Sequence, residues 1–393
     1  MRMPMENKRL KVALIGVGSM GKKYAEMIAS GKVSNMKLTA MVIRRNELME
    51  WGRSVVNVDG QPVRIFRSAE ELYDAATDTM KTDDTNHILY DAVMIVTPHK
   101  THAELALKAF ALGKDVLCDK PAASDLGEAL AMTEASEKYQ RIYGIVYHQR
   151  LYPKYQKMKQ LIDDGELGKL RRVSLINSRY LRTSHYHHSA SWRSSFIGEG
   201  GGALINQGQH LLDMFQYLFG MPQRIFALIP FGKYNDFAVD DEDTILMNYD
   251  NGMTASFVLT TGEAVHEERM EIIGTRARVL LENNTLTITR YPDIEKYIKT
   301  EKVNSRENMN FTEEIIEFTE GPEPYIELLN CFAQASLEHN TEYLVAKGAE
   351  GMNSLMLCAA AYYSASKNMP VELPLDSEKY KKLMDELMAK EQK

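Results

Sequence analysis

The sequence predicts an α/β fold with two domains: an N-terminal doubly wound parallel sheet, then an α+β domain with a large open, mainly antiparallel sheet. Three observations support this prediction. At 393 residues, the chain is too long for a single ordinary core. Strand-like apolar runs alternate with helical patterns up to about residue 147, as in parallel sheets with crossover helices. After residue 150, strand-like runs follow one another directly, which is typical of antiparallel sheets.

The first domain is expected to cover residues 1–150. Its apolar runs predict strands at residues 12–15, 38–43, 63–66, 92–96, 115–118 and 143–147. Apolar residues at helical spacing predict helices at residues 20–30, 103–112 and 126–139.

The second domain is expected to cover residues 151–345. Its strands are predicted at residues 171–178, 224–229, 243–249, 253–260, 269–273, 277–282 and 286–291. Asp250-Asn251-Gly252 predicts a tight hairpin turn, because Asn and Gly accept positive φ. We expect helices to cover one face of this sheet and a second copy of the chain to cover the other, which predicts a homo-oligomer.

Helical patterns end the chain. A helix is expected at residues 325–339, and a later one at about residues 346–372 is expected to pack back on the first domain. The charged segment 375–393 predicts a solvated surface helix.

Composition excludes several classes of protein. Hydrophobic residues make up 44% of the chain and charged residues 26%, and no apolar run approaches the roughly 18 residues of a membrane helix. The net charge of −7 argues against a nucleic-acid partner.

Cys118, Cys331 and Cys358 lack the spacing of a metal or redox site, so we expect reduced structural thiols and no bound metal. The first strand begins too early to leave room for a secretion signal, so we expect a cytoplasmic protein.

A glycine-rich turn, Gly16-Val17-Gly18-Ser19-Met20-Gly21, joins the first strand to the first helix. In this context such a turn binds the pyrophosphate of a dinucleotide. Gly16 would allow the tight turn, Gly18 the close approach of the phosphates, and Gly21 the contact between helix and strand. The helix N-terminus would add unpaired N–H groups, including those of Ser19 and Met20, and a positive dipole. The sequence therefore predicts a dinucleotide site.

Two further turns follow apolar strands: Thr97-Pro98-His99-Lys100-Thr101-His102 and Asp119-Lys120-Pro121. The carboxyl ends of parallel strands open onto the cofactor crevice, so we expect cofactor contacts from Thr97, Pro98, His99, His102, Asp119 and Lys120. Pro121 fixes the local φ and holds Lys120 over the crevice, where its ammonium can donate a hydrogen bond to an alcohol or carbonyl oxygen. A plain strand-to-helix turn and a solvent-exposed lysine are the alternatives.

A second glycine run, Gly200-Gly201-Gly202, leads to a candidate proton acceptor. Asn206 and His210 are one helical turn apart and share a helix face, and Asp213 follows closely enough to orient or cap. A histidine here can accept a proton, although a histidine packed on an apolar helix produces the same pattern.

The segment before this run is rich in aromatic, imidazole and arginine side chains. It contains Tyr180, Arg182, His185, Tyr186, His187, His188, Trp192 and Arg193. Aromatic faces can cover the C–H surfaces of a sugar, and the polar groups can bind its hydroxyls. The predicted substrate contacts are Tyr180, Arg182, His185, Trp192 and Arg193. The histidine spacing supplies no clear zinc site, and a polar loop without a ligand is the alternative.

Together these motifs resemble the glucose-fructose oxidoreductase, inositol dehydrogenase and rhizopine catabolism family (Gfo/Idh/MocA) over nearly the whole chain. Gly165-Glu166-Leu167-Gly168 is also similar to the family, and Asp119-Lys120-Pro121 stands where Glu-Lys-Pro is commoner. The resemblance implies a Rossmann domain followed by an α/β domain with a large open sheet, and activity on sugars and cyclic polyols. It also implies that Lys120 positions the substrate oxygen, while His210 takes the hydroxyl proton as hydride leaves for the nicotinamide.

Two positions refine what the resemblance implies. Many relatives have Asp where this chain has Asn206; since Asn cannot accept a proton, we expect Asn206 to bind a sugar hydroxyl and His210 to act alone as base. The acid that would bind the ribose of NAD, about 20 residues past the glycines, is replaced by Ile43-Arg44-Arg45. Arginines accommodate a 2′-phosphate or stack on adenine, so Arg44 and Arg45 favour NADP slightly and leave NAD open.

The predicted function is an NAD(P)-dependent oxidoreductase acting on a secondary hydroxyl of a sugar, a glycoside or a cyclic polyol, with oxidation at C3 of a glucoside as one form. One alternative is a related enzyme that retains and recycles its cofactor during glycoside cleavage or epimerisation. Another is a dinucleotide-binding regulator without turnover, which would have no need for both Lys120 and His210.

Overall fold

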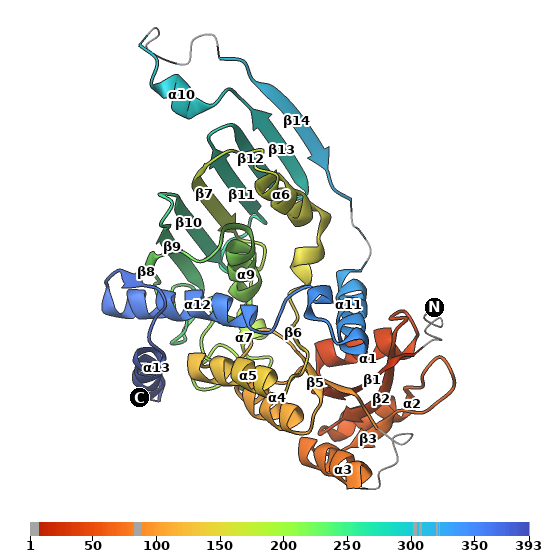
Figure 1. Ribbon diagram of the computed structural model, residues 1–393. Helices are drawn as coiled ribbons and strands as arrows, with labels where there is room; N and C mark the ends of the chain where they lie inside the picture. Colours follow the sequence, from red (N-terminus) through yellow and green to blue (C-terminus); the bar gives the residue numbers. More distant parts are fainter. Residues whose placement is uncertain are drawn as a thin grey trace, which may run out of the picture. The chain divides into compact units, whose positions relative to one another are not determined.

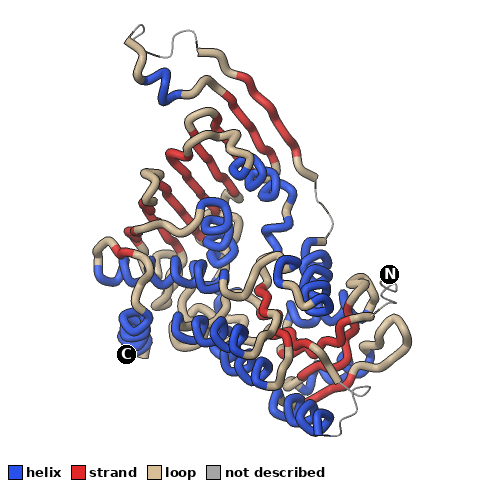
Figure 2. The backbone as a smooth tube through the Cα atoms, viewed as in Figure 1, coloured by secondary structure: helices blue, strands red, loops and turns tan. Residues whose placement is uncertain are grey.

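The computed structural model describes residues 8–81, 89–301, 305, 309–319, 321 and 323–392. The chain divides into two compact units. Unit 1 is Met1–Leu151 with Pro322–Leu355, and unit 2 is Tyr152–Gly321 with Met356–Lys393. Each unit has its own sheet, and the strands and helices of each can be followed in Figures 1 and 2.

Unit 1 contains a six-stranded parallel sheet in the order β3-β2-β1-β4-β5-β6. The strands are β1 (Leu10–Ile15), β2 (Met36–Val42), β3 (Arg64–Phe66), β4 (Ala92–Ile95), β5 (Asp115–Cys118) and β6 (Tyr143–Ile145). The helices before α6 are α1 (Ser19–Ala29), α2 (Met49–Ser54), α3 (Ala69–Lys81), α4 (His102–Ala111) and α5 (Leu126–Lys138). The order of strands reverses between β1 and β4, which is the switch point of a doubly wound fold. The predicted parallel sheet is confirmed, and β4 and β5 are buried throughout, which explains their unbroken apolar runs.

Helix α11 (Pro324–Glu338) belongs to unit 1, which corrects the predicted second domain of residues 151–345. Leu329 and Phe332 belong to the same buried cluster as residues of β1 and β2. Ser336 Oγ also donates a hydrogen bond of 2.8 Å to Asp115 Oδ2 at the start of β5. The division between the units falls within α12 (Glu350–Lys367), so only the start of the helix expected at residues 346–372 is in unit 1. Burial of apolar surface, and not order in the chain, decides membership of a core.

Unit 2 contains a nine-stranded sheet in the order β14-β13-β12-β11-β7-β10-β9-β8-β15. Neighbouring strands are antiparallel except for β7 and β10, which run parallel. The strands are β7 (Leu170–Asn177), β8 (Arg224–Leu228), β9 (Glu242–Asn248), β10 (Thr254–Thr260), β11 (Glu268–Gly274), β12 (Ala277–Glu282), β13 (Thr285–Arg290), β14 (Thr312–Glu317) and β15 (Val371–Glu372). The helices are α6 (Pro153–Asp163), α7 (Ser184–His187), α8 (Ala203–Asn206), α9 (Gly208–Phe219), α10 (Ile294–Ile298) and α13 (Ser377–Glu391). The predicted open, mainly antiparallel sheet is confirmed.

Local sequence accounts for much of this sheet. Gly252 adopts φ +82° in the turn between β9 and β10, where its N–H donates to the carbonyl of Tyr249 (3.0 Å). Phe257 points to the covered face of β10 and packs against Phe215 of α9, with ring centroids 5.8 Å apart. Strand β14 was not predicted, because it is an edge strand with charged, exposed side chains and no alternating apolar face.

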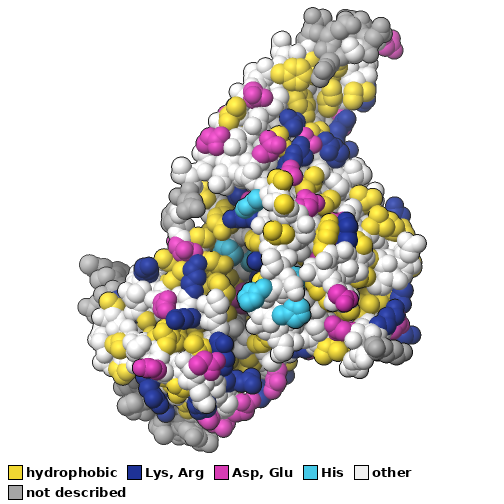
Figure 3. All heavy atoms as spheres, turned by 180° about the vertical axis from the view of Figure 1, so that it is seen from behind, with side chains coloured by type: hydrophobic (Ala, Val, Ile, Leu, Met, Phe, Trp, Pro, Cys, Tyr) yellow, Lys and Arg dark blue, Asp and Glu magenta, His cyan; other side chains and the backbone are white. Residues whose placement is uncertain are grey.

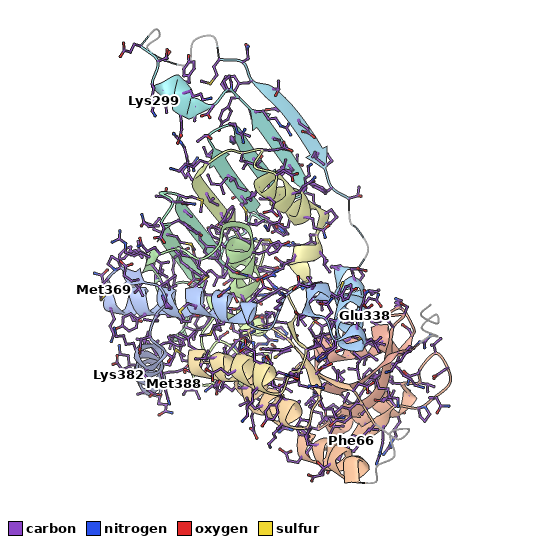
Figure 4. All side chains as sticks on the ribbon, viewed as in Figure 1. Phe66, Lys299, Glu338, Met369, Lys382 and Met388 are labelled. Atoms are coloured by element: carbon purple, nitrogen blue, oxygen red, sulfur yellow. The ribbon has the colours of Figure 1, made fainter. Side chains whose placement is uncertain are left out.

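The C-terminal helix α13 is not the fully solvated helix that its charge predicts. Tyr380, Leu383, Met384 and Leu387 recur at helical spacing and are all buried. Lys382, labelled in Figure 4, is exposed, and Met388 near the end of the helix is half-buried. One apolar stripe therefore packs α13 onto unit 2. Within the described residues, no helix is both long and apolar enough to span a bilayer.

Candidate functional site

The glycine turn of unit 1 forms a narrow backbone cradle between β1 and α1. Gly16 has φ +101°, and a Cβ there would lie 2.4 Å from the carbonyl oxygen of Val96. A Cβ at Gly21 would lie 2.1 Å from the carbonyl oxygen of Gly16. In contrast, a Cβ at Gly18 would meet no atom within 4 Å. The outer glycines therefore serve close backbone packing, while Gly18 faces open space at the start of α1, where helix N–H groups have no partner within the helix. This cradle fits a pyrophosphate.

Arginines surround the end of β2. Arg45 Nη2 donates a hydrogen bond of 3.1 Å to the carbonyl oxygen of Val17, inside the glycine turn. Arg67 Nη2, beyond the end of β3, donates to the carbonyl oxygen of Arg44 (3.0 Å) and to Asn46 Oδ1 (2.6 Å). Arg67 was not among the predicted site residues; it holds the short loop that carries Arg44, whose side chain is exposed.

The three predicted turns of unit 1 lie along one edge of the sheet. The N–H of Val96 donates to the carbonyl of Ile15 (2.8 Å), and the N–H of Asp119 donates to the carbonyl of Ile95 (2.9 Å). These bonds place the ends of β1, β4 and β5 side by side. The glycine turn, the Thr97 turn and the Asp119-Lys120-Pro121 turn are therefore neighbours at the carboxyl edge.

His102 lies between two of these turns, and its side chain contacts the backbone of both. The side chain is fully buried, with Nδ1 2.9 Å from the carbonyl oxygen of Pro121 and Nε2 2.8 Å from that of Thr97. Burial lowers the pKa of His102. Its ring joins the two turns and so positions Lys120. His99 is also buried, and its ring packs edge-on against that of His102.

Lys120 and Asp119 form a polar pair at the end of β5. Asp119 Oδ1 accepts a hydrogen bond of 2.8 Å from the backbone N–H of Lys120. Burial raises the pKa of Asp119, and the charge of Lys120 opposes this effect. The carboxylate therefore orients the backbone from which the Lys120 side chain extends.

His148 is a site residue that the sequence analysis missed, although it follows β6 at the same carboxyl edge. Its ring is 5% exposed and stacks on Tyr325 with centroids 4.0 Å apart. Burial, together with the positive charges of Lys120 and Lys23, lowers the pKa of His148 to about 3. The strand-end rule that drew attention to Lys120 could have found His148 as well.

The low pKa of His148 predicts a pH-dependent stability. In the unfolded chain, His titrates near pH 6.5. Below that pH the unfolded chain therefore binds a proton at His148 that the folded chain does not bind, so stability falls as the pH is lowered. As the pH falls from about 7 to 5, this histidine should lower the free energy of unfolding by about 2 kcal/mol. Denaturant unfolding of the wild type and of His148→Gln at both pH values measures the difference. An equal loss of stability in the two proteins would contradict the prediction.

In unit 2, the glycine run is fixed by Asp240 and Tyr362. Asp240 Oδ1 accepts hydrogen bonds from the N–H of Gly202 (2.8 Å) and from Tyr362 Oη (2.6 Å), and its Oδ2 accepts one from the N–H of Leu204 (2.6 Å). Gly201 has φ +149°, and a Cβ there would lie 2.3 Å from Tyr362 Oη. Burial raises the pKa of Asp240, and these donors oppose the rise. The start of the segment that leads to His210 is thus held by a buried carboxylate.

Asn206 and His210 lie on two consecutive helices, α8 and α9, and not on the single helix implied by their spacing. Gln207 joins the helices with φ −72° and ψ −40°, so the backbone stays helical and the one-turn spacing is kept. Asp213 is buried and accepts a hydrogen bond of 2.9 Å from Gln216.

Glu199 supplies a carboxylate beside Asn206. Its side chain is only 2% exposed, and its Oε1 accepts a hydrogen bond of 2.5 Å from Asn206 Nδ2. Its Oε2 accepts one of 2.7 Å from the N–H of Ser194. This residue was not predicted, because a lone Glu before a glycine run carries no signal of its own in the sequence. A buried carboxylate therefore lies next to the Asn206 amide.

Most predicted substrate contacts gather around Tyr186. The Arg182 guanidinium lies 4.2 Å from the centroid of the Tyr186 ring and 5.5 Å from that of Tyr180. The Arg193 guanidinium lies over both Tyr186 and Trp192, and its Nη1 donates to Tyr186 Oη (2.9 Å). His185, by contrast, is exposed on α7. Across the part of the chain that is described, no three His, Cys, Asp or Glu side chains are grouped to hold a metal ion.

The parallel sheet with a glycine cradle at its switch point defines unit 1 as a dinucleotide-binding Rossmann domain. A family model described as "Oxidoreductase family, NAD-binding Rossmann fold" matches residues 10–147, and one described as "GFO/IDH/MocA C-terminal domain" matches residues 155–280. Together they match more than half of the chain. The protein belongs to the Gfo/Idh/MocA oxidoreductase family.

Two curated relatives resemble part of the chain. The rhizopine catabolism protein MocA of Rhizobium meliloti is 27% identical over 56% of this chain and 60% of its own length. The levoglucosan dehydrogenase of Pseudarthrobacter phenanthrenivorans is 27% identical over 56% of this chain and 54% of its own length. These matches thus span little more than half of each relative.

Solved structures share the fold over nearly the whole chain. The WlbA dehydrogenase of Bordetella pertussis, in complex with NADH and UDP-GlcNAcA, has a TM-score of 0.72 at 21% identity, covering 94% of this chain and 100% of its own. A levoglucosan dehydrogenase in complex with NADH and levoglucosan has a TM-score of 0.73 at 22% identity with the same coverage.

Proposed function

We propose that this protein is an NAD(P)-dependent oxidoreductase that moves hydride between the nicotinamide and a secondary hydroxyl of a sugar, glycoside or cyclic polyol. The observation that carries the proposal is the carboxyl edge of unit 1, where the glycine cradle, the Thr97 turn and Lys120 follow three adjacent strands. The open space at Gly18 supports a dinucleotide, and a lysine at the same edge supports chemistry on an oxygen atom. Membership of an NAD-binding oxidoreductase family supports the same conclusion.

When bound, the nicotinamide supplies the hydride acceptor. We assign to Lys120 a hydrogen bond to the oxygen of the reacting alcohol, which orients it and stabilises negative charge there. We assign to His210 the proton of that hydroxyl. The C–H bond then breaks with its electron pair leaving as hydride, and the alcohol becomes a carbonyl. Removing the hydroxyl proton favours loss of hydride, and such proton transfer typically contributes about 10²- to 10⁴-fold in rate.

The cluster around Tyr186 supports a sugar-like substrate. The rings of Tyr180, Tyr186 and Trp192 carry the two arginines over them, and aromatic surface together with hydrogen-bond donors is the combination that hydroxylated rings need. The named relatives include a levoglucosan dehydrogenase and inositol 2-dehydrogenases. We propose that Asn206 contacts a substrate hydroxyl beside this cluster.

Turnover with a panel of sugars, glycosides and cyclic polyols tests the proposal. We expect at least one of them to reduce NAD⁺ or NADP⁺, followed by the near-ultraviolet absorbance of the reduced nicotinamide. Nucleotide released by denaturing the purified protein shows whether a retained cofactor hides the reaction. No reduction with any substrate and no released nucleotide would contradict the proposal and favour a regulator without turnover.

Cofactor choice is expected to depend on Arg44. Its exposed side chain follows β2, where a 2′-phosphate would lie, and a charge-assisted hydrogen bond to phosphate typically stabilises a complex by about 1.5–3 kcal/mol. Arg44→Ser should therefore weaken NADPH binding by about 10- to 100-fold and leave NADH binding unchanged. Calorimetric titration with both cofactors measures this, with Arg53→Ser on α2 as the matched control. A clear preference of the wild type for NADH would refute the 2′-phosphate assignment.

We also propose a homo-oligomer that forms through the open face of the unit 2 sheet. Strand register places Leu246, Ser256, Ser174, Glu271, Leu280, Thr287 and Ile315 in one row on this face. Leu246 is 50% exposed and Ile315 is 60% exposed. Glu271 is paired with Arg172 (2.8 Å) and Arg278 (2.7 Å), which lowers the cost of covering its charge. Figure 3, seen from behind, shows apolar and charged side chains intermixed on the molecular surface.

Leu246→Glu should dissociate this oligomer, because it places a charge without a partner on the face where the two copies would meet. Light scattering coupled to size-exclusion chromatography would then show the monomer mass. Leu130→Glu, an exposed leucine of α5, is the matched control and should keep the mass of the wild type. A wild-type protein that is already monomeric would contradict the proposal.

A cytoplasmic location completes the proposal. Cys118, Cys331 and Cys358 form no disulfide, and unpaired thiols are usual in reducing compartments. Fractionation of the cells that produce the protein tests this location, and we expect the protein in the cytoplasmic fraction.

A further inference from the structure

The last residue of helix α13 contacts the loop that precedes the glycine run of unit 2. Glu391 Oε2 accepts hydrogen bonds from the N–H of Ile197 (2.9 Å) and from Ser195 Oγ (3.2 Å), and its Oε1 accepts one from the N–H of Phe196 (3.3 Å). One carboxylate therefore binds three donors of residues 195–197, almost two hundred positions earlier in the chain. We propose that Glu391 is a positioning residue: it ties the C-terminal helix to this loop and thereby holds Glu199 and Asn206 in place for substrate.

The position of Glu391 on its helix supports a specific role. The C-terminal end of a helix carries partial negative charge, so a carboxylate at the last helical residue is disfavoured unless donors from elsewhere offset the repulsion. The three donors of the loop do so. The buried stripe of α13, with Tyr380, Leu383 and Leu387, anchors the helix, so that its end is a firm support for the loop.

The loop transmits this contact to the candidate site through short hydrogen bonds. The carbonyl oxygen of Ser195 accepts from the N–H of Glu199 (2.8 Å) and of Gly200 (3.1 Å), which folds residues 195–200 into a tight turn. The Glu199 side chain then binds Asn206 Nδ2 and the N–H of Ser194. Glu391 thus binds the start of a turn, residues 195–197, and Glu199 near the end of the same turn binds Asn206.

The packing of Phe196 also holds this loop, which limits the expected effect of removing the Glu391 side chain. Phe196 is buried, and its ring packs edge-on against those of Phe231 and Tyr362, with centroids 5.9 and 6.0 Å away. Without Glu391, this packing would still hold the middle of the loop. We therefore expect a looser loop in a folded protein, and not a collapse of unit 2.

Hydrogen–deuterium exchange of the full-length protein tests the contact without any need for activity. Glu391→Ala should accelerate exchange of the amides of Phe196 and Ile197 by about tenfold or more, as expected when charge-assisted hydrogen bonds are lost. Glu391→Gln keeps one acceptor oxygen and should fall between alanine and the wild type. Glu386→Gln is the matched control on the same helix, because Glu386 pairs with Lys367 and not with the loop. Unchanged exchange of these amides in Glu391→Ala would overturn the proposal.

The effect on substrate rests on the proposed function and has its own readout. With a substrate that the panel identifies, Glu391→Ala should raise KM by about tenfold, change kcat little and leave NADH affinity unchanged, since one lost charged contact is worth about a factor of ten. Glu391→Gln should recover part of the affinity. A tenfold fall in kcat at unchanged KM in Glu391→Ala would refute the positioning role. Faster exchange together with no turnover on any substrate would instead refute the proposed function and leave the Glu391 contact standing.

Discussion

Replacing His210 by alanine is expected to lower kcat by about 10²- to 10⁴-fold and to leave NADH affinity unchanged. The proposed reaction needs a group that takes the hydroxyl proton, and an alanine cannot do so. Steady-state kinetics and calorimetric titration with NADH measure the two quantities. His266→Ala, an exposed histidine of the same unit, is the control and should keep full activity.

Asn206→Ala distinguishes binding from proton transfer at the same site. We expect a higher KM with little change in kcat, because an amide can hydrogen-bond a hydroxyl but cannot accept its proton. If Asn206→Ala lost as much kcat as His210→Ala at unchanged KM, this division of roles would be wrong. Asn206→Asp is not a restoring substitution, because it would place a second carboxylate next to the buried Glu199.

The second large effect is expected at the glycine cradle of unit 1. Gly16→Ala should lower the free energy of unfolding by about 3 kcal/mol or more and Tm by about 10 °C, because φ +101° and the contact with Val96 both exclude a Cβ. Gly18→Ala should leave Tm unchanged, since its Cβ meets no protein atom within 4 Å, yet weaken NADH binding by crowding the phosphates. Thermal unfolding and NADH titration of both variants separate the two roles.

Gly60→Ala provides the baseline for this comparison. Gly60 also has positive φ, at +79°, but no atom lies within 4 Å of its Cβ position, so it reports the cost of backbone strain alone. A Gly18→Ala variant with normal NADH affinity would show that no phosphate lies against this glycine.

Local signals predicted most of the architecture. The apolar runs before Gly16, Thr97 and Asp119 predicted β1, β4 and β5, because a strand buried on both faces needs apolar side chains at every position. The turn at Gly252 was predicted by the positive φ that glycine accepts. Charged edge strand β14 and the buried stripe of α13 were missed, because solvent-facing charge dominated both segments.

The surroundings of the candidate site residues were harder to predict from the sequence. The strand-end rule drew attention to Lys120 and His102 alike, but it could not show that the His102 side chain is buried between two turns. Composition drew attention to the aromatic and arginine residues around Tyr186 but could not show that His185 is exposed. Burial and side-chain direction depend on which distant segments pack nearby, and a run of neighbouring residues does not contain that information.

By itself, the sequence determined the dinucleotide-binding turn, the two sheets and the family, because glycine conformation, apolar periodicity and motif spacing are local properties. Only the tertiary structure decided that the Glu199 carboxylate lies beside Asn206, that His148 lies at the carboxyl edge with its pKa lowered by burial and by Lys120 and Lys23, and that Glu391 contacts the loop of residues 195–197. Glu391 and His148 meet partners that are far away along the chain. Such contacts arise when folding closes long loops, and they leave no pattern in the local sequence.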